Sequence, residues 1–167
     1  MEDRVTTATL KAIIIDVQAM VRQRADTNEI TTTISRLGRA LDAQEWDEFG
    51  SIFAEDATAI FAAGKFEGLT AITDYGREAH KSFAVLQHVI TDHIVELDAD
   101  KASAKANLVC YAVATDWQPD KQMPFMIGGY YKIELTRTPQ GWRIVHLVLD
   151  YLWSNGAVKW NDSPAVQ

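Results

Sequence analysis

The hydrophobic period of the chain changes at Gln87. Before this residue, apolar side chains recur every three or four positions, as at Leu10, Ile13 and Ile14, which is the spacing of one helix face. From Gln87 onward apolar and polar residues alternate, as in strands with one buried side. Helices followed by a long antiparallel run predict an α+β fold, with helices packed on the concave face of a strongly curved antiparallel or mixed sheet. Such an arrangement leaves a deep apolar pocket between the two layers.

Two consecutive helices are expected at the N-terminus. The first covers residues 8–24 and lies in an additional N-terminal segment, residues 1–25, which could cap a cavity or pack on a partner subunit. Asp26 followed by Glu29 has the spacing of a capping box, so the second helix is expected to begin there. The apolar stripe of this second helix consists of Ile30, Ile34, Leu37 and Leu41.

The other elements are expected to be shorter, and together they form a single domain over residues 1–167. The sequence predicts a helix from Glu45 to Phe53, a strand from Thr58 to Ala62, a turn from Gly64 to Gly68, a helix over residues 69–82, strands that begin at Gln87, Lys101, Phe125 and Trp142, and a polar tail over residues 157–167.

Composition excludes several classes of protein. With 47% hydrophobic and 23% charged residues, the chain can form a core without metals or disulfides. A net charge of −7 argues against a nucleic-acid partner. The single cysteine, Cys110, lies in the strand-like run NLVCYAV, where a buried and inert thiol is expected. The sequence shows no signal peptide and no run long enough to span a membrane, so a cytoplasmic protein is expected.

Familiar motifs for metal and cofactor chemistry are absent from the sequence. It contains no HExxH, no P-loop, no GxGxxG and no GxSxG. His88 and His93 are five positions apart, so on one strand they are expected to face opposite sides and could not bind one metal ion together. We therefore expect no metal and no cofactor.

General acid–base chemistry remains, with His88 as the natural proton carrier. Asp42 lies at the border of the second helix's apolar stripe, above Gly38, and could reach His88 if the fold brings them together; an exposed carboxylate is an equally good reading of its position. Tyr111 and Tyr130 could donate hydrogen bonds to a developing oxyanion, although tyrosines in strands are more often packing residues.

Three stretches carry a family resemblance: RLGRALDAQEWDEFGSIFAEDA, QHVITDHIVELDADKASAKA and GGYYKIELTRTPQGWRIVHLVLDYLWSNG. Over residues 28–156 the chain resembles the SnoaL-like branch of the NTF2-like superfamily, including scytalone dehydratase and bile-acid dehydratase. The resemblance implies a cone-shaped fold, a cofactor-free reaction, and a homo-oligomer, either dimer or trimer. It also implies that His88 acts as general base with Asp42 as its partner. Similar dehydratases carry a tyrosine where this chain has Leu37, and an acidic residue or histidine where it has Tyr111.

The sequence therefore predicts a lyase or isomerase for a hydrophobic cyclic small molecule, of the dehydratase, double-bond isomerase or cyclase type. Two alternatives stay open: a non-catalytic small-molecule binding protein, and an assembly subunit with the same fold. The residues expected to contact the ligand are Tyr111, Tyr130, Trp46, Leu37, Phe61 and Tyr75.

Overall fold

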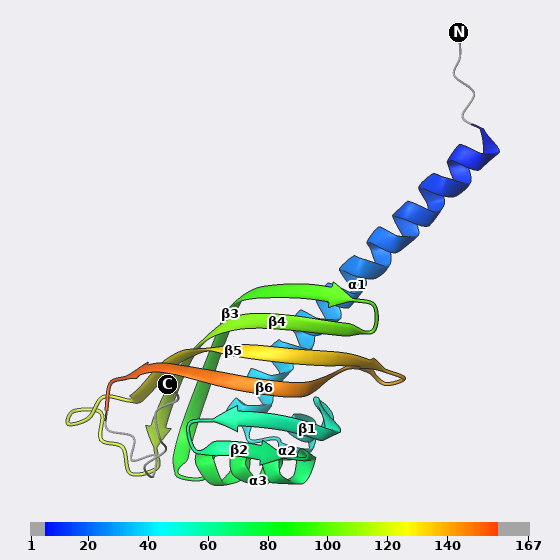
Figure 1. Ribbon diagram of the computed structural model, residues 1–167. Coiled ribbons are helices and arrows are strands. Elements are labelled where there is room, and N and C mark those ends of the chain that lie inside the picture. Colours follow the sequence, from blue (N-terminus) through cyan, green and yellow to red (C-terminus); the bar gives the residue numbers. More distant parts are fainter. Residues whose placement is uncertain (1–5, 157–167) are drawn as a thin grey trace.

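A long helix, two short helices and a six-stranded sheet make up the computed structural model, which describes residues 6–156 (Figure 1). In chain order the elements are α1 (Thr7–Ala43), α2 (Trp46–Ser51), β1 (Phe53–Phe61), β2 (Gly64–Glu67), α3 (Leu69–His80), β3 (Phe83–Asp98), β4 (Lys101–Ala114), β5 (Phe125–Thr138) and β6 (Gly141–Ser154). The expected α+β class is confirmed.

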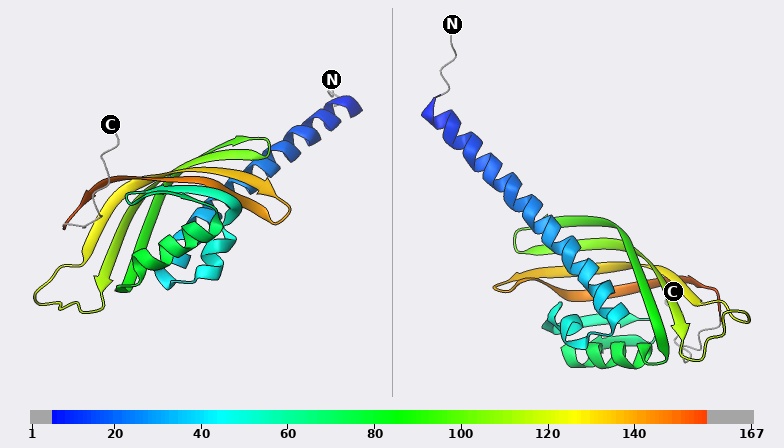
Figure 2. Two further views of the ribbon diagram at one scale, coloured as in Figure 1. Left: turned by 60° about the horizontal axis from the view of Figure 1, so that its bottom comes forward. Right: turned by 180° about the vertical axis from the view of Figure 1, so that it is seen from behind.

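The sheet is mixed and strongly curved. Its strand order is β2-β1-β6-β5-β4-β3, and all neighbours are antiparallel except β1 and β6, which run parallel. The C-terminal half of α1, together with α2 and α3, lies on the concave side (Figure 2). The buried apolar side chains of these helices and of the inner sheet face form one core, because each layer hides its apolar side against the other.

The expected break between two N-terminal helices is wrong, because α1 runs without interruption from Thr7 to Ala43. Its true N-cap is Thr6, whose Oγ1 accepts a hydrogen bond from the backbone nitrogen of Thr9. Asp26 and Glu29 do not cap a helix. They bind residues more than a hundred positions away on the β5–β6 hairpin.

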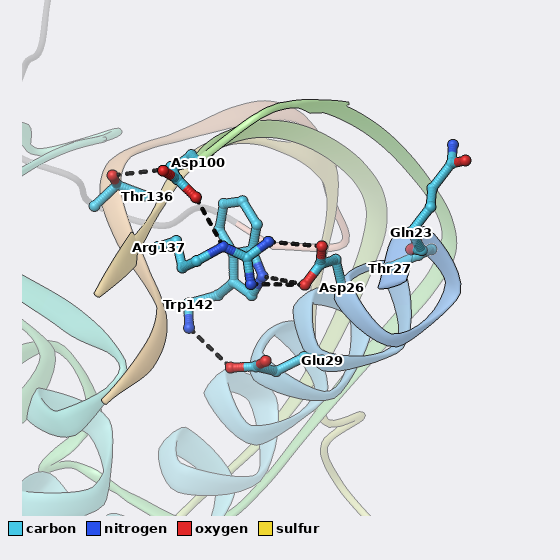
Figure 3. Close-up of polar contacts among 8 residues, drawn as sticks. All are labelled: Gln23, Asp26, Thr27, Glu29, Asp100, Thr136, Arg137 and Trp142. Atoms are coloured by element: carbon cyan, nitrogen blue, oxygen red, sulfur yellow. Dashed lines mark hydrogen bonds and ion pairs between the residues drawn. The ribbon is translucent and has the colours of Figure 1, made fainter. Parts of the chain in front are cut away.

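Asp26 anchors the middle of α1 to that hairpin (Figure 3). Nη1 and Nη2 of Arg137 donate to the two carboxylate oxygens of Asp26 at 2.7 and 2.6 Å, and Nε1 of Trp142 donates to Oδ1 at 3.4 Å. The Arg137 guanidinium lies 4.6 Å from the centre of a Trp142 ring. The hydrogen bonds from Arg137 lower the pKa of Asp26, as expected for a carboxylate held by a bidentate arginine.

The residues before Asp26 form an exposed N-terminal arm, which we define as residues 7–25. All of them are exposed, and the arm extends away from the sheet (Figures 1 and 2). Six of its side chains, each 50–62% exposed, form the arm stripe: Leu10, Ile13, Ile14, Val17, Met20 and Val21. At 100° per residue this stripe lies about 150° around the helix from the face that packs on the sheet. The arm therefore turns its apolar side away from its own domain.

Several shorter boundaries also differ from the expectation. The helix expected from Glu45 to Phe53 is shorter, α2 at Trp46–Ser51, and the strand expected from Thr58 to Ala62 begins earlier, because β1 starts at Phe53. Gly64–Glu67 is a strand, β2, and Gly68 follows it at φ 83 to begin α3, a backbone conformation that suits glycine. The polar tail expected over residues 157–167 lies outside the described residues. Within residues 6–156 no helix is both long enough and apolar enough to cross a membrane.

Candidate active site

A cavity of about 260 Å³ lies between the helices and the concave face of the sheet. Its wall is mostly apolar, and the side chains come from all three helices and from β1, β3, β4, β5 and β6. The polar or titratable groups in the wall are Tyr75, His80, Ser82, His88, Cys110, Tyr131 and Tyr151. This composition, an apolar enclosure with a few polar groups, is typical of small-molecule sites.

Asp42 is hydrogen-bonded to His88, and of the two residues only His88 lines the cavity. Oδ1 of Asp42 lies 2.7 Å from Nδ1 of His88 and accepts a second bond, also at 2.7 Å, from the His88 backbone nitrogen. The His88 side chain is only 5% exposed and that of Asp42 is 20% exposed. Because an ionised carboxylate can only accept, the proton of the neutral imidazole sits on Nδ1. Nε2 then carries a lone pair, and no group among residues 6–156 bonds to it.

Gly38 explains why α1 can bring Asp42 so close to β3. A Cβ at this position would lie 3.1 Å from Cδ1 of Ile90 and 3.4 Å from the backbone oxygen of His88. Glycine thus lets the helix approach the strand without a side chain between them. Asp42 follows one turn later on the same helix face, which places its carboxylate over the start of β3.

A second imidazole, His80, stands beside the first and was not expected from the sequence. It is the last residue of α3, and its ring centre lies 5.5 Å from that of His88. Nδ1 of His80 lies 2.7 Å from the backbone oxygen of Gly76. Burial lowers the pKa of His80. A histidine in the last turn of a helix is usually a surface residue near the negative helix end, so only the tertiary fold identifies it.

Tyr111 and Tyr130 do not line the cavity, and the expectation that they do is wrong. In β4 the even-numbered residues, such as Leu108 and Cys110, are buried on the inner face, so Tyr111 lies on the outer face and is 38% exposed. Tyr130 also lies on the outer side, where Nζ of Lys132 is 5.6 Å from its ring centre. Alternation divides a strand into two faces but does not say which one is buried.

Three other tyrosines line the cavity: Tyr75 on α3, Tyr131 on β5 and Tyr151 on β6. Burial raises the pKa of Tyr75 to about 12 and raises the pKa of Tyr131 further, so both hydroxyls keep their protons near neutral pH. No group among residues 6–156 bonds to either hydroxyl. A buried tyrosine normally finds a partner for its hydroxyl, so both are available to a ligand.

The other expected contact residues are divided between two places. Leu37 and Phe61 lie in the cavity wall together with Tyr75. Trp46 lies outside it, with its ring packed edge-on against Phe49 and with Arg77 5.5 Å from its centre. Trp46 therefore supports the wall from behind. Cys110 lines the cavity, and burial raises the pKa of its thiol to about 12, so it is protonated and a poor nucleophile.

The expectation that His88 and His93 face opposite sides of β3 is wrong. A bulge between Thr91 and Ile94 shifts the alternation by one residue. Ile94 is exposed, so His93 turns to the inner side, where its Nε2 is buried without a hydrogen-bond partner. Even so, the described part of the chain contains no cluster of three or more potential metal ligands.

Comparisons with known proteins identify the domain. Residues 22–148 match the family described as the SnoaL-like domain. An uncharacterised protein of Mycobacterium tuberculosis is 27% identical over 130 residues, which cover 77% of this chain and 86% of the relative.

Solved structures share the fold. An NTF2-like superfamily protein from Salmonella enterica superposes with a TM-score of 0.69 at 20% identity, covering 82% of this chain and 98% of that one. A scytalone dehydratase-like protein from Novosphingobium aromaticivorans has a TM-score of 0.70 at 16% identity, covering 82% and 88%. A hexachlorocyclohexane dehydrochlorinase, LinA type 2, has a TM-score of 0.70 at 17% identity, covering 87% and 96%. The cone-shaped NTF2-like fold is thereby confirmed.

Proposed function

The chain belongs to the SnoaL-like domain family, and on that premise we propose that it is a cofactor-free lyase or isomerase for a hydrophobic cyclic small molecule. The single observation that carries this proposal is the Asp42–His88 pair at the wall of an apolar cavity. A histidine base whose orientation is fixed by a carboxylate can remove a proton from a carbon atom. The structural likeness to a dehydrochlorinase and to a scytalone dehydratase-like protein agrees with elimination or isomerisation chemistry.

In the proposed reaction Nε2 of His88 takes a proton from a carbon next to a carbonyl group. The electron pair left on that carbon moves into the carbonyl, and an enolate forms. Asp42 holds the Nδ1 proton and stabilises the imidazolium that results. Tyr75 or Tyr131 donates a hydrogen bond to the enolate oxygen, because both residues line the cavity and both hydroxyls are protonated and have no partner among residues 6–156. His88 then returns the proton to another carbon, which moves the double bond, or to a departing hydroxyl group, which releases water.

The two alternatives make different demands on the cavity. A non-catalytic binding protein would use the same apolar walls but would not need the Asp42–His88 pair. An assembly subunit would be expected to fill its cone with side chains, and a cavity of about 260 Å³ weighs against that reading. The cavity of about 260 Å³ lies just under the lower limit of about 300 Å³ for small-molecule pockets, so the proposed ligand is a compact ring system.

We also propose that the chain associates with a second copy of itself through the arm stripe. The stripe has the i, i+3, i+4, i+7 spacing of helix pairing, is uncharged, and lies on the helix side away from its own domain. It exposes on the order of 600 Å², so two copies would bury about 1,200 Å², the lower end of specific interfaces. Most of the arm precedes residue 22, where the family match begins.

The proposed reaction can be tested with a panel of enolisable cyclic ketones and β-hydroxy ketones, followed by ultraviolet absorbance of the conjugated product. We expect the wild-type protein to isomerise or dehydrate at least one compound and His88→Asn to lose that activity. Equal turnover by the wild type and His88→Asn would exclude His88 as the base. Tight binding of panel members without any turnover would favour the binding-protein alternative.

A further inference from the structure

We propose that His80 forms an acceptor subsite in the cavity, which takes an O–H or N–H group of the bound ring compound. The inference rests on one premise of the proposed function, namely that the cavity binds the ligand. It adds a substrate class: a hydrophobic cyclic molecule with a hydroxyl or N–H group on the same ring system as the carbon that loses its proton.

The position of His80 gives it access to the same ligand as His88. Its ring lines the cavity, 5.5 Å from the ring of His88 and 6.1 Å from that of Trp46, centre to centre. Two imidazoles at this separation can contact different groups of one ring compound. Trp46 packs against the His80 ring and limits its movement.

Hydrogen bonding fixes which nitrogen of His80 faces the ligand as an acceptor. The backbone oxygen of Gly76, 2.7 Å from Nδ1, can only accept, so Nδ1 carries a proton. In the neutral ring Nε2 then has a free lone pair. No donor among residues 6–156 bonds to Nε2, so its partner has to come from the ligand or from water.

The surroundings of His80 keep the ring neutral. Burial, the largest influence, lowers its pKa, and the neighbouring His88 also lowers it. The hydrogen bond to the Gly76 backbone oxygen and the charge of Asp42 raise the pKa, but the net direction is downward. When His88 becomes an imidazolium during the reaction, a second positive charge on His80 is disfavoured even more. His80 therefore serves as an acceptor throughout, and the proton of the reaction stays on His88.

A pair of probe compounds tests this assignment: 2-naphthol, which has an O–H donor, and 2-methoxynaphthalene, which does not. Their dissociation constants would be measured by calorimetry at pH 7.5 for the wild type and for His80→Phe, which keeps a ring but removes the acceptor. We expect the wild type to bind 2-naphthol about five- to tenfold more tightly. In His80→Phe this preference should fall below twofold.

Three further variants sharpen the result. His80→Gln retains an acceptor and should keep most of the preference if its amide oxygen replaces Nε2. His88→Phe should also keep it, which separates the subsite from the proposed base and makes the result independent of catalysis. His146→Phe is the matched control, since His146 bonds Thr58 and does not line the cavity. Equal wild-type affinities, or a preference that survives in His80→Phe, would overturn the assignment. If neither probe bound, both the subsite and the proposed ring-binding function would be contradicted.

Discussion

One oxygen of Asp42 holds both the main chain and the side chain of His88, because Oδ1 lies 2.7 Å from the backbone nitrogen and 2.7 Å from Nδ1. The first bond fixes where β3 begins relative to α1. The second fixes the orientation and the tautomer of the imidazole. A single carboxylate therefore positions the strand and prepares the base that the strand carries.

Replacement of Asp42 by asparagine should lower turnover about 10²- to 10⁴-fold, because the neutral amide no longer stabilises the imidazolium. The fold should persist, since the amide oxygen can still accept the backbone bond. Steady-state kinetics and thermal unfolding would be measured together. Asp47 is an exposed carboxylate on the neighbouring helix α2. Asp47→Asn is therefore the control and should retain full activity.

Gly38→Leu should separate the helix from the strand, because the added side chain has no room beside Ile90 and His88. The Asp42–His88 bond should lengthen and turnover should fall, although neither residue has been changed. The Nδ1 proton of His88 in ¹H–¹⁵N NMR spectra reports the bond directly. An unchanged spectrum would show that the close approach at Gly38 does not position the pair. Gly50→Leu is the comparison, because a Cβ at Gly50 has no neighbour closer than 3.7 Å.

His80 should make the protein less stable at mildly acid pH. Burial lowers its pKa below the ordinary value of 6.5, so the unfolded chain binds a proton more readily than the folded one. The free energy of unfolding should therefore fall as the pH drops below about 6.5. His88 and Asp42 are the titratable groups that face the ring. Urea unfolding at pH 7.5 and pH 5.5 should show a smaller loss for His80→Phe than for the wild type, and equal losses would contradict this account.

Asp26→Ala should destabilise the protein by about 3 kcal/mol, because it leaves Arg137 and the Trp142 indole without their shared acceptor. The lowered pKa of Asp26 means that its contribution is present above about pH 4, and it is lost as the pH falls through the folded-state value. Chemical unfolding at pH 7 measures the first effect. Glu67→Ala removes the exposed pair with Lys65 and should have no measurable effect.

The arm stripe offers two adjacent residues for a matched test of self-association. Ile14 belongs to the stripe, whereas Ile15 is 64% exposed on another side of the arm. Ile14→Glu should weaken self-association at least tenfold in sedimentation velocity experiments, and Ile15→Glu should leave it unchanged. Weak protein interfaces already form at a protein concentration of about 10⁻⁴ M (100 µM), so a wild-type protein that stays monomeric at this concentration would contradict the proposal.

Local sequence spacing was sufficient to predict the α+β class, because the class follows from the change in hydrophobic period. Spacing placed Asp42 at the edge of an apolar stripe but left its burial open, and its pairing with His88 was implied by the family resemblance. Spacing failed at Asp26 and Glu29. Their spacing is the same inside a helix as at its start, and their partners Arg137 and Trp142 lie more than a hundred positions away. No local pattern could reveal those contacts.

The polar wall of the cavity was harder to predict. In β4 the inner face consists largely of alanines, such as Ala104 and Ala106, which leave space, while the more prominent Tyr111 faces outward. In β5 a register shift at Gly128 and Gly129 accompanies the inward position of Tyr131. His80 reaches the cavity only because α3 packs across the sheet. These positions depend on tertiary packing, which residue spacing alone does not predict.

Deuterium exchange at the α-carbon of an enolisable cyclic ketone tests the central claim most directly, because it detects proton removal without knowledge of the natural substrate. Cyclohexanone, 2-tetralone and a steroid enone would be incubated with the protein in D₂O at constant pD, and the α-proton signals followed by NMR. We predict that the wild type accelerates exchange for at least one of them, that Asp42→Asn reduces the acceleration, and that His88→Asn abolishes it. Exchange no faster than in buffer for all three ketones, or equal acceleration by His88→Asn, would contradict the assignment of the Asp42–His88 pair as the proton-abstracting base.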